Sequence, residues 1–234
     1  EGTIVGKVGG TDIGISPASV DGGATVVFTA TPTAGYKVVG FYSDAECESN
    51  LIQEPKQAEG AVETYTISAI SEDASVYVKF DYIDYTIAMA VSPSGKGTIT
   101  PPSVTQAHIN VPFTISASNT EGYTFNNWTS TDNITITTGG TTTATLINVT
   151  GDKTITANFT EDMHSVAVVS EDPSKGTVST ASVSNIGIDT KSGDIIATPN
   201  PGYYFTGWDI PSGVTLAAGY TNKSATIQIN ATAD

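Results

Sequence analysis

The sequence predicts a mainly β fold built from three small modules in tandem, and three observations point to it. One sequence pattern recurs three times along the 234 residues. Within each copy, apolar and polar residues alternate with the period of two that is typical of a half-buried strand, as at Val26, Phe28 and Ala30. Short groups of turn-forming residues, such as Pro93-Ser94-Gly95, interrupt these runs. We therefore expect roughly five to six short strands in each copy and little helix.

Recurring anchor residues define the register of the repeat. Each copy has a Gly-Tyr pair, followed five positions after the tyrosine by a second aromatic residue. A glycine or an asparagine precedes that aromatic residue, which predicts a β-bulge there, because these residue types enter the left-handed region most easily. The bulge should turn the aromatic side chain into the core. The anchors are Gly35, Tyr36 and Phe41 in the first copy, Gly122, Tyr123 and Trp128 in the second, and Gly202, Tyr203 and Trp208 in the third. A Gly-Thr pair that begins at Gly10, Gly97 and Gly176 offers a further anchor upstream.

The module boundaries follow from the period of the repeat. Tyr85 and His164 begin the second and third copies, so their separation along the chain is one full period. We expect modules at residues 1–82, 83–161 and 162–234. The first should carry an insertion near residues 43–62 and a shortened N-terminal strand, and the third should lack its last strand. The connections at residues 81–84 and 160–163 are too short for free tumbling, so the array should be elongated and semi-rigid.

The charge of the chain excludes two classes of partner. It has 24 acidic and nine basic residues, a net charge of −15, and no arginine. Nucleic-acid binding needs clustered cations for phosphates, and anionic membrane surfaces attract polybasic segments. We therefore expect no nucleic-acid partner. The sequence also lacks an apolar run long enough to cross a bilayer, so no membrane insertion of this segment is expected.

Several short segments carry a resemblance to a known family. They are Lys96-Gly97-Thr98-Ile99-Thr100, Ala197-Thr198-Pro199 with the following Gly202-Tyr203, and the closing run from Asp152 to Phe159. With these segments the copies resemble the internalin-type B-repeat and its divergent relatives, including the Listeria–Bacteroides repeat, of bacterial cell-surface proteins. The resemblance implies a compact β-grasp-like module that occurs in strings on exported proteins. The strand pattern leaves an immunoglobulin-like sandwich open as the alternative.

Aromatic residues provide the first candidates for a binding site. Trp128 and Trp208 share their register with Phe41, as a packing requirement would produce, so we expect them in the core. Aromatic residues outside the register are better candidates for a platform on which sugar rings stack. These weak candidates are Tyr42, Tyr204 and Tyr220.

An acidic segment in the insertion provides the second candidate. Asp44, Glu46 and Glu48 place oxygen ligands at alternate positions, as in a calcium loop. The segment lacks the glycine and the distal bidentate glutamate of an EF-hand, so a solvated acidic loop is the default interpretation. The two histidines, His108 and His164, do not have a zinc-ligand spacing. We expect no resident metal and no cofactor.

These observations predict a non-catalytic tandem-repeat region. The sequence has no nucleophile elbow and no metal-ligand motif, and modules of about 80 residues rarely enclose a catalytic cleft. We expect a monomeric, acidic segment of a larger secreted chain on a bacterial cell surface. Its role would be that of a stalk or of adhesion modules, with an unidentified protein or glycan as partner. The alternative is a carbohydrate-binding module of a surface glycan-handling system.

Overall fold

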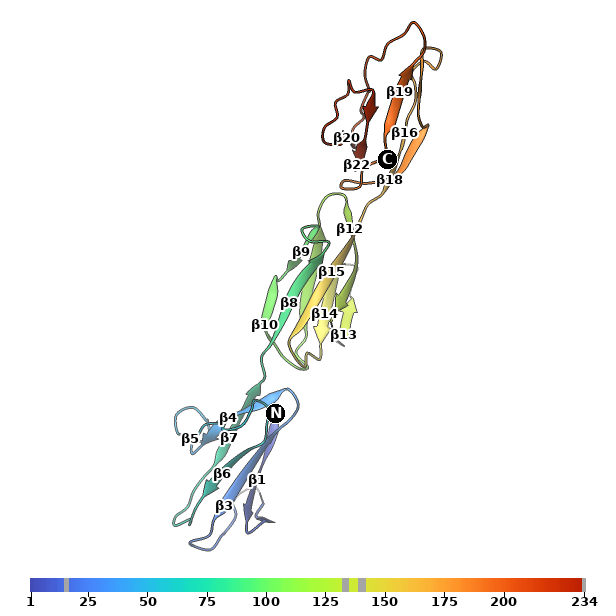
Figure 1. Cartoon of the computed structure of the whole chain (residues 1–234). Coiled ribbons are helices and arrows are strands. Elements are labelled where there is room, and N and C mark those ends of the chain that lie inside the picture. The colour runs from blue at the N-terminus through green and yellow to red at the C-terminus, as the bar shows by residue number, and fades with distance from the viewer. Residues whose placement is uncertain (15–16, 132–134, 139–141, 233–234) are drawn as a thin grey trace.

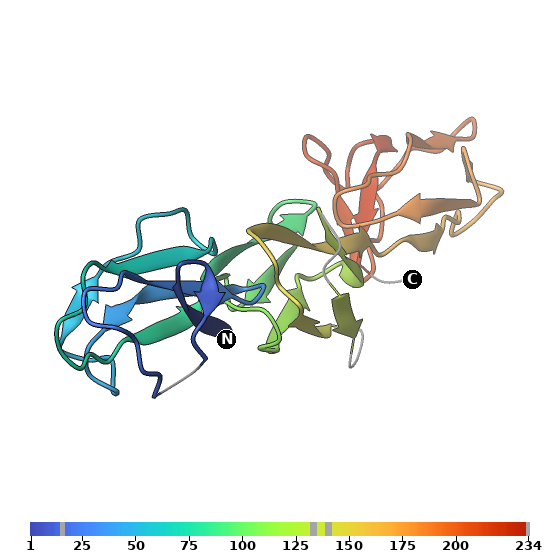
Figure 2. The same ribbon diagram turned by 90° about the horizontal axis from the view of Figure 1, so that it is seen from below.

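The computed structural model describes residues 1–14, 17–131, 135–138 and 142–232, and every regular element in that part of the chain is a β-strand. Figures 1 and 2 show three modules that follow one another end to end. The prediction of a mainly β array of three modules is confirmed. The described part of the chain contains no helix that is long and apolar enough to cross a membrane.

Module 2 has the fullest set of strands. They are β8 (Tyr85–Ser92), β9 (Gly97–Thr100), β10 (Ser103–Ala107), β11 (Phe113–Asn119), β12 (Tyr123–Ser130), β13 (Thr135–Thr138), β14 (Thr143–Ile147) and β15 (Lys153–Glu161). One sheet has the order β10-β8-β15-β12, and the other has the order β13-β14-β11-β9. β15 lies inside its sheet, antiparallel to β12 and parallel to β8. The described residues of module 2 form two four-stranded sheets and no helix, which corresponds to the sandwich alternative.

The core of module 2 forms between these two sheets. Ile87 and Ile155 from one sheet, and Ile115 and Leu146 from the other, are fully buried in one cluster. On β15 the inward residues alternate with outward polar ones, as the period of two requires. Burying one such aliphatic side chain stabilises the fold by roughly 1.5–3 kcal/mol. The module therefore depends on the apolar alternation that the sequence displays.

Modules 1 and 3 follow the same plan, but the described part of each has fewer pairs of hydrogen-bonded strands. Module 1 has β1 (Gly2–Val8), β2 (Thr11–Asp12), β3 (Val26–Pro32), β4 (Tyr36–Tyr42), β5 (Leu51–Gln53), β6 (Glu63–Ile67) and β7 (Tyr77–Tyr82). Module 3 has β16 (His164–Ala167), β17 (Gly176–Val178), β18 (Ser182–Ile186), β19 (Ile195–Pro199), β20 (Val214–Leu216), β21 (Thr226–Ile227) and β22 (Ile229–Ala231). β7 takes the place of β15 and pairs with β4. Residues 203–210 take the place of β12 but have no strand partner in the described part of module 3.

One sequence anchor is wrong in module 1. β1 pairs Gly2 with Pro32 in the way that β9 pairs Gly97 with Asn119. The rings of Phe80 and Phe159 pack directly over Gly2 and Gly97, respectively. Gly2, and not Gly10, is therefore the structural counterpart of Gly97. The loop that follows β1 is longer than its counterpart in module 2, so a constant spacing identifies the wrong glycine.

The predicted bulge is present in modules 1 and 2. The pairing register shifts between Phe125 and Asn127 on β12, and between Val38 and Gly40 on β4. Neither Gly40 nor Asn127 takes the left-handed conformation that we expected. A Cβ at Gly40 would lie 2.5 Å from the end of the exposed Leu51 side chain and 3.1 Å from the Gln53 carbonyl oxygen, so the backbone of β5 leaves little room for a side chain there.

The bulge places the second aromatic anchor in the core. Phe41 is 0% and Trp128 is 8% exposed. Trp208 is half-buried and donates its indole N–H to the Ser224 carbonyl (2.9 Å). In the described part of module 3, residues 203–210 lack a strand partner of the kind that β15 provides for β12, which accounts for the greater exposure of Trp208.

Residues 43–62 lie between β4 and β6 and contain β5. The Glu63 side chain, which is only 2% exposed, organises part of this stretch. Its carboxylate accepts the backbone N–H groups of Lys56 (2.9 Å) and Gln57 (2.6 Å). A buried carboxylate is tolerated because these hydrogen bonds replace its hydration.

The substitution Ile155→Ala should destabilise module 2 by about 2–5 kcal/mol, because it leaves a cavity between the two sheets. Chemical denaturation followed by Trp128 fluorescence would measure the loss. Thr124→Ala on the exposed face of β12 is the matched control and should change the free energy of unfolding by less than about 0.5 kcal/mol. Equal effects of the two substitutions would contradict the assignment of β15 to the core.

Candidate functional site

The three candidate sugar-stacking tyrosines do not form one surface. Tyr42 is 8% exposed, so it cannot present its ring face to a sugar. Tyr220 is half-buried and packs against the core of module 3. Tyr204 is 83% exposed. Of the three, Tyr204 keeps a ring available to a ligand.

The acidic segment of the insertion is organised by backbone hydrogen bonds. The Asp44 carboxylate accepts the N–H groups of Glu48 (3.0 Å) and Asn50 (2.9 Å). The bond from Glu48 is the main cause of a lowered pKa for Asp44. Glu46 and Glu48 point into solvent. Among the described residues, no group of three or more His, Cys, Asp or Glu side chains could hold a metal ion.

Cys47 lies in the same loop and is buried. Burial is the main cause that raises the pKa of its thiol, and the Asp44 carboxylate adds to it. A thiol with a raised pKa is a poor nucleophile. These surroundings are those of a structural cysteine.

The recurrent contacts outside the cores lie at the two joints between modules, and the Gly-Tyr anchors are at their centre. The carbonyl of Gly35 accepts the backbone N–H of Ile83 (2.9 Å), and the carbonyl of Gly122 accepts that of Asp162 (2.9 Å). Ile83 and Asp162 lie in the connections to the next module, and they are one repeat period apart. The same hydrogen bond therefore fixes the chain at the start of both joints.

A side chain of the following module packs on the same glycine. Ile109 of module 2 contacts Gly35, and Ile188 of module 3 contacts Gly122. A Cβ on Gly122 would lie 2.7 Å from Ile188 Cγ2, and a Cβ on Gly35 would overlap Ile109. Both glycines also have a positive φ, +84° and +74°, which residues with a side chain rarely adopt. We call Gly35 and Gly122 the glycine sockets, and Ile109 and Ile188 the isoleucine knobs.

The first joint adds an aromatic stack. Tyr36 stacks on Tyr82 with ring centroids 4.7 Å apart, and Tyr82 stacks on His108 at 4.6 Å. His108 Nε2 lies 2.7 Å from Asp84 Oδ1. The stack runs from module 1 through the connection into module 2.

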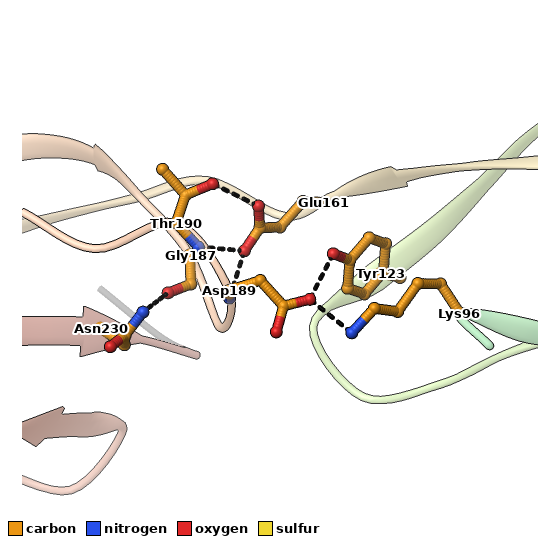
Figure 3. Close-up of polar contacts among 7 residues, drawn as sticks. All are labelled: Lys96, Tyr123, Glu161, Gly187, Asp189, Thr190 and Asn230. Atoms are coloured by element: carbon orange, nitrogen blue, oxygen red, sulfur yellow. Dashed lines mark hydrogen bonds and ion pairs between the residues drawn. The ribbon is translucent and has the colours of Figure 1, made fainter. Parts of the chain in front are cut away.

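The second joint replaces the stack with charged groups (Figure 3). The Glu161 carboxylate accepts the backbone N–H groups of Asp189 (2.5 Å) and Thr190 (2.8 Å), and the Thr190 hydroxyl (2.6 Å). The Asp189 carboxylate accepts the Tyr123 phenol (2.6 Å) and forms an ion pair with Lys96. Both carboxylates therefore bridge module 2, or its connection, to one turn of module 3.

The turn that carries Ile188 is held by the core of module 3. Gly187 N–H donates to the Thr190 carbonyl (2.7 Å), which closes the turn. The Gly187 carbonyl accepts the Asn230 side chain (3.2 Å), as Figure 3 shows, and the Ala231 N–H (3.1 Å). The joint is thereby connected to β22.

The electrostatics of the second joint favour the ionised carboxylates. The Lys96 ammonium, followed by the Tyr123 phenol, lowers the pKa of Asp189. Partial burial would raise the pKa of Glu161, but the hydrogen bonds from Thr190 and from the Asp189 N–H outweigh it and lower the pKa. The hydrogen bond to Asp189 raises the pKa of Tyr123 to about 12.

Sequence reasoning located the Gly-Tyr anchors but missed the joints. The repeat pattern predicts Gly35 and Gly122 as register anchors, but it does not predict that Ile109 and Ile188 pack on them. The signal was available, because these two isoleucines are also separated by one repeat period.

Comparison with known proteins gives one family. A family model described as a divergent InlB B-repeat domain matches residues 2–83, 87–163 and 166–234. No curated protein sequence gives a significant match. The same is true of the solved structures.

The substitution Gly122→Ala should open the second joint, because it places a methyl group against Ile188. The amide exchange of Asp162, whose N–H binds the Gly122 carbonyl, would report the opening as a rate increase of at least about tenfold. Gly202→Ala is a matched control, since Gly202 has a similar φ of +88° but no atom within 4 Å of the added position. If both substitutions left the Asp162 exchange rate unchanged, the socket would have no role in the joint.

Acid should weaken the second joint before it unfolds the modules. The joint lowers the pKa values of the Glu161 and Asp189 carboxyls. The ionised carboxylates therefore stabilise the joint fully at any pH above the ordinary carboxyl pKa of about 4. This stability is lost as the pH falls through the lowered pKa values. The amide shifts of Asp189 and Thr190, followed from pH 7 to about pH 2.5, would record the loss. Glu161→Gln keeps an oxygen acceptor without the charge and should make the Thr190 shift nearly independent of pH. A Thr190 shift in the unmodified chain that does not respond to acid would contradict this account.

Proposed function

Because the chain belongs to the divergent InlB B-repeat domain family, which is associated with bacterial cell-surface proteins, we propose that it is a semi-rigid stalk segment of an exported surface protein. In this role it has no catalytic activity. It holds whatever is attached to its ends at a set distance from the cell.

The repeated joint is the observation that carries this proposal. Each joint has the same hydrogen bond to a glycine carbonyl and the same isoleucine contact, at positions one period apart. Identical joints add a similar translation and rotation for each module, as in other linear repeat proteins. Flexible linkers without side-chain contacts would not maintain such a spacing.

The charge of the chain is consistent with a stalk. A net charge of −15 disfavours the collapse of one module onto another and keeps neighbouring stalks apart. Lys96 is engaged at the second joint, and Lys37 pairs with Glu59 inside module 1 (2.7 Å). Positive charge is therefore used for local contacts, while the overall field remains negative.

Glycan binding is a second candidate function, and one observation favours it. Tyr204 is 83% exposed and its neighbour Tyr203 is 51% exposed, at the end of β19 that lies away from module 2 (Figure 1). Exposed tyrosine rings can stack on sugars. The stalk proposal does not require this activity.

Small-angle scattering on the intact chain would test the stalk. A compact globule of 234 residues has a radius of gyration of about 17 Å. Three modules in line, with centres about 35 Å apart as the length of a nine-residue strand suggests, give about 30 Å. The stalk proposal predicts the larger value and a maximum dimension that does not vary with salt concentration. A radius of gyration as small as that of the compact globule would exclude an extended array.

A glycan array with the intact chain and with Tyr204→Ala would separate the two functions. The stalk proposal predicts no glycan signal that depends on Tyr204. A bound glycan whose signal falls at least tenfold in the variant would establish the second function. Thr124→Ala, at the corresponding position of module 2, is the control.

A further inference from the structure

Module 3 carries a third copy of the glycine socket at its far end. At the second joint, module 2 contacts module 3 through Lys96, Gly122 and Tyr123. The residues at the same repeat positions of module 3 are Lys175, Gly202 and Tyr203. The third socket is open, because Gly202 has no atom within 4 Å of the position that a Cβ would take. Tyr203 is 51% exposed, whereas Tyr123 in the filled joint is 5% exposed.

The backbone of the third socket has the conformation of a filled one. The N–H of Asn200 donates to the Lys175 carbonyl (2.9 Å), as the N–H of Thr120 donates to that of Lys96 (3.3 Å). The N–H of Tyr203 donates to the Asn200 carbonyl (3.0 Å), and φ of Gly202 is +88°. The surface is therefore preorganised, and a partner would not have to order it.

The charge of the socket matches the residue that follows the knob. In module 1, Glu1 takes the place of Lys96, since its carbonyl accepts the N–H of Thr33 (2.9 Å). The residue after the first knob is the neutral Asn110, whereas the residue after the second knob, opposite Lys96, is Asp189. An acidic side chain is therefore used where the socket carries a lysine.

Lys175 is available for such a partner. Its nearest acidic group is Asp172, three residues earlier in the chain, at 3.1 Å. Both side chains are exposed to solvent, and an ion pair of this kind contributes little to stability. Exchanging it for an aspartate that, like Asp189, also accepts a tyrosine phenol is therefore inexpensive.

We propose that the far end of module 3 is a docking surface for one more module of this repeat class, which inserts an isoleucine knob against Gly202 and an aspartate between Lys175 and Tyr203. The inference rests on the stalk proposal and specifies its next joint. The polarity is fixed, because the socket is on the preceding module and the knob is on the following one at both existing joints.

The opposite end of the chain does not offer this knob. The turn of module 1 that corresponds to the knob turn has Gly22 and Gly23 where module 2 has Ile109 and Asn110. The two turns are equivalent because the same hydrogen bond closes each of them. It joins the N–H of Ala24 to the carbonyl of Asp21 (3.1 Å) in module 1, and the N–H of Val111 to the carbonyl of His108 (3.4 Å) in module 2. The chain should therefore not associate head to tail with a second copy of itself.

A chain with four modules tests the docking surface. Residues 153–234 are repeated after Asp234, so that the appended copy supplies a β15 strand, a connection and a module with the Ile188-Asp189 knob. A soluble paramagnetic probe should broaden the Tyr203 signals about tenfold less than in the original chain, in proportion to the exposed fractions of Tyr203 and Tyr123. Tyr204 should stay accessible, because its counterpart Thr124 is exposed in the filled joint.

Two matched variants of the four-module chain assign the effect to the knob and to the charge. Ile188→Gly in the appended copy places a glycine at the knob position, as Gly22 does in module 1, and should return Tyr203 to its original accessibility. Lys175→Glu should do so in part. If the appended module folds but Tyr203 stays as accessible as before, the inference is overturned. Scattering on the unmodified chain tests the first two joints separately, so failure of the stalk and failure of this docking surface are distinguishable.

A second experiment does not require an appended module to fold. In the original chain, Gly22→Ile together with Gly23→Asp gives module 1 a knob. At about 1 mM chain, comparable to the effective concentration across a short linker, the Gly202 and Tyr203 signals should then shift with concentration. Lys175→Glu should abolish the shifts. The absence of any concentration-dependent shift in the knob variant would also overturn the proposal.

Discussion

The contact of an isoleucine with a glycine turn of the preceding module is the constraint on which the array depends. The turn needs a positive φ, and the isoleucine needs the space that a Cβ would occupy, so glycine meets two requirements at once at Gly35 and Gly122. A backbone hydrogen bond to the same glycine fixes the connection. Backbone geometry and an apolar contact thus determine the joint, and the surrounding polar groups can differ.

The two joints reach this geometry with different chemistry. Tyr82 stacks between Tyr36 and His108 in the first, whereas Glu161 binds the backbone of the next turn in the second. The first joint also contains the contact of His108 with Asp84, whereas the second contains two carboxylates whose pKa values are lowered. The array therefore has a constant joint geometry that different polar groups support.

The period of the repeat and the alternation of apolar residues were sufficient to predict the three modules, their β character and the bulges before Phe41 and Trp128. They predict five to six strands in a module, whereas the described part of the chain has seven in modules 1 and 3 and eight in module 2. They could not predict the joints, because the partner of each Gly-Tyr pair lies in another module and no local pattern marks it. Tyr42 lies outside the repeat register and is therefore predicted as a surface ring, but its side chain is buried. Spacing also identified Gly10 in place of Gly2, because a loop length differs between modules 1 and 2. Local periodicity thus predicts cores well, whereas contacts between modules and across loops of variable length require the structure.

Residual dipolar couplings of the backbone amides in the intact chain would test the central claim most directly, since they report the orientation of each module in one alignment frame. If the glycine sockets hold the modules in line, the three modules will fit a single alignment tensor with the same magnitude and axis. Three tensors of different magnitude, each fitting one module alone, would show that the joints are flexible and would contradict the account.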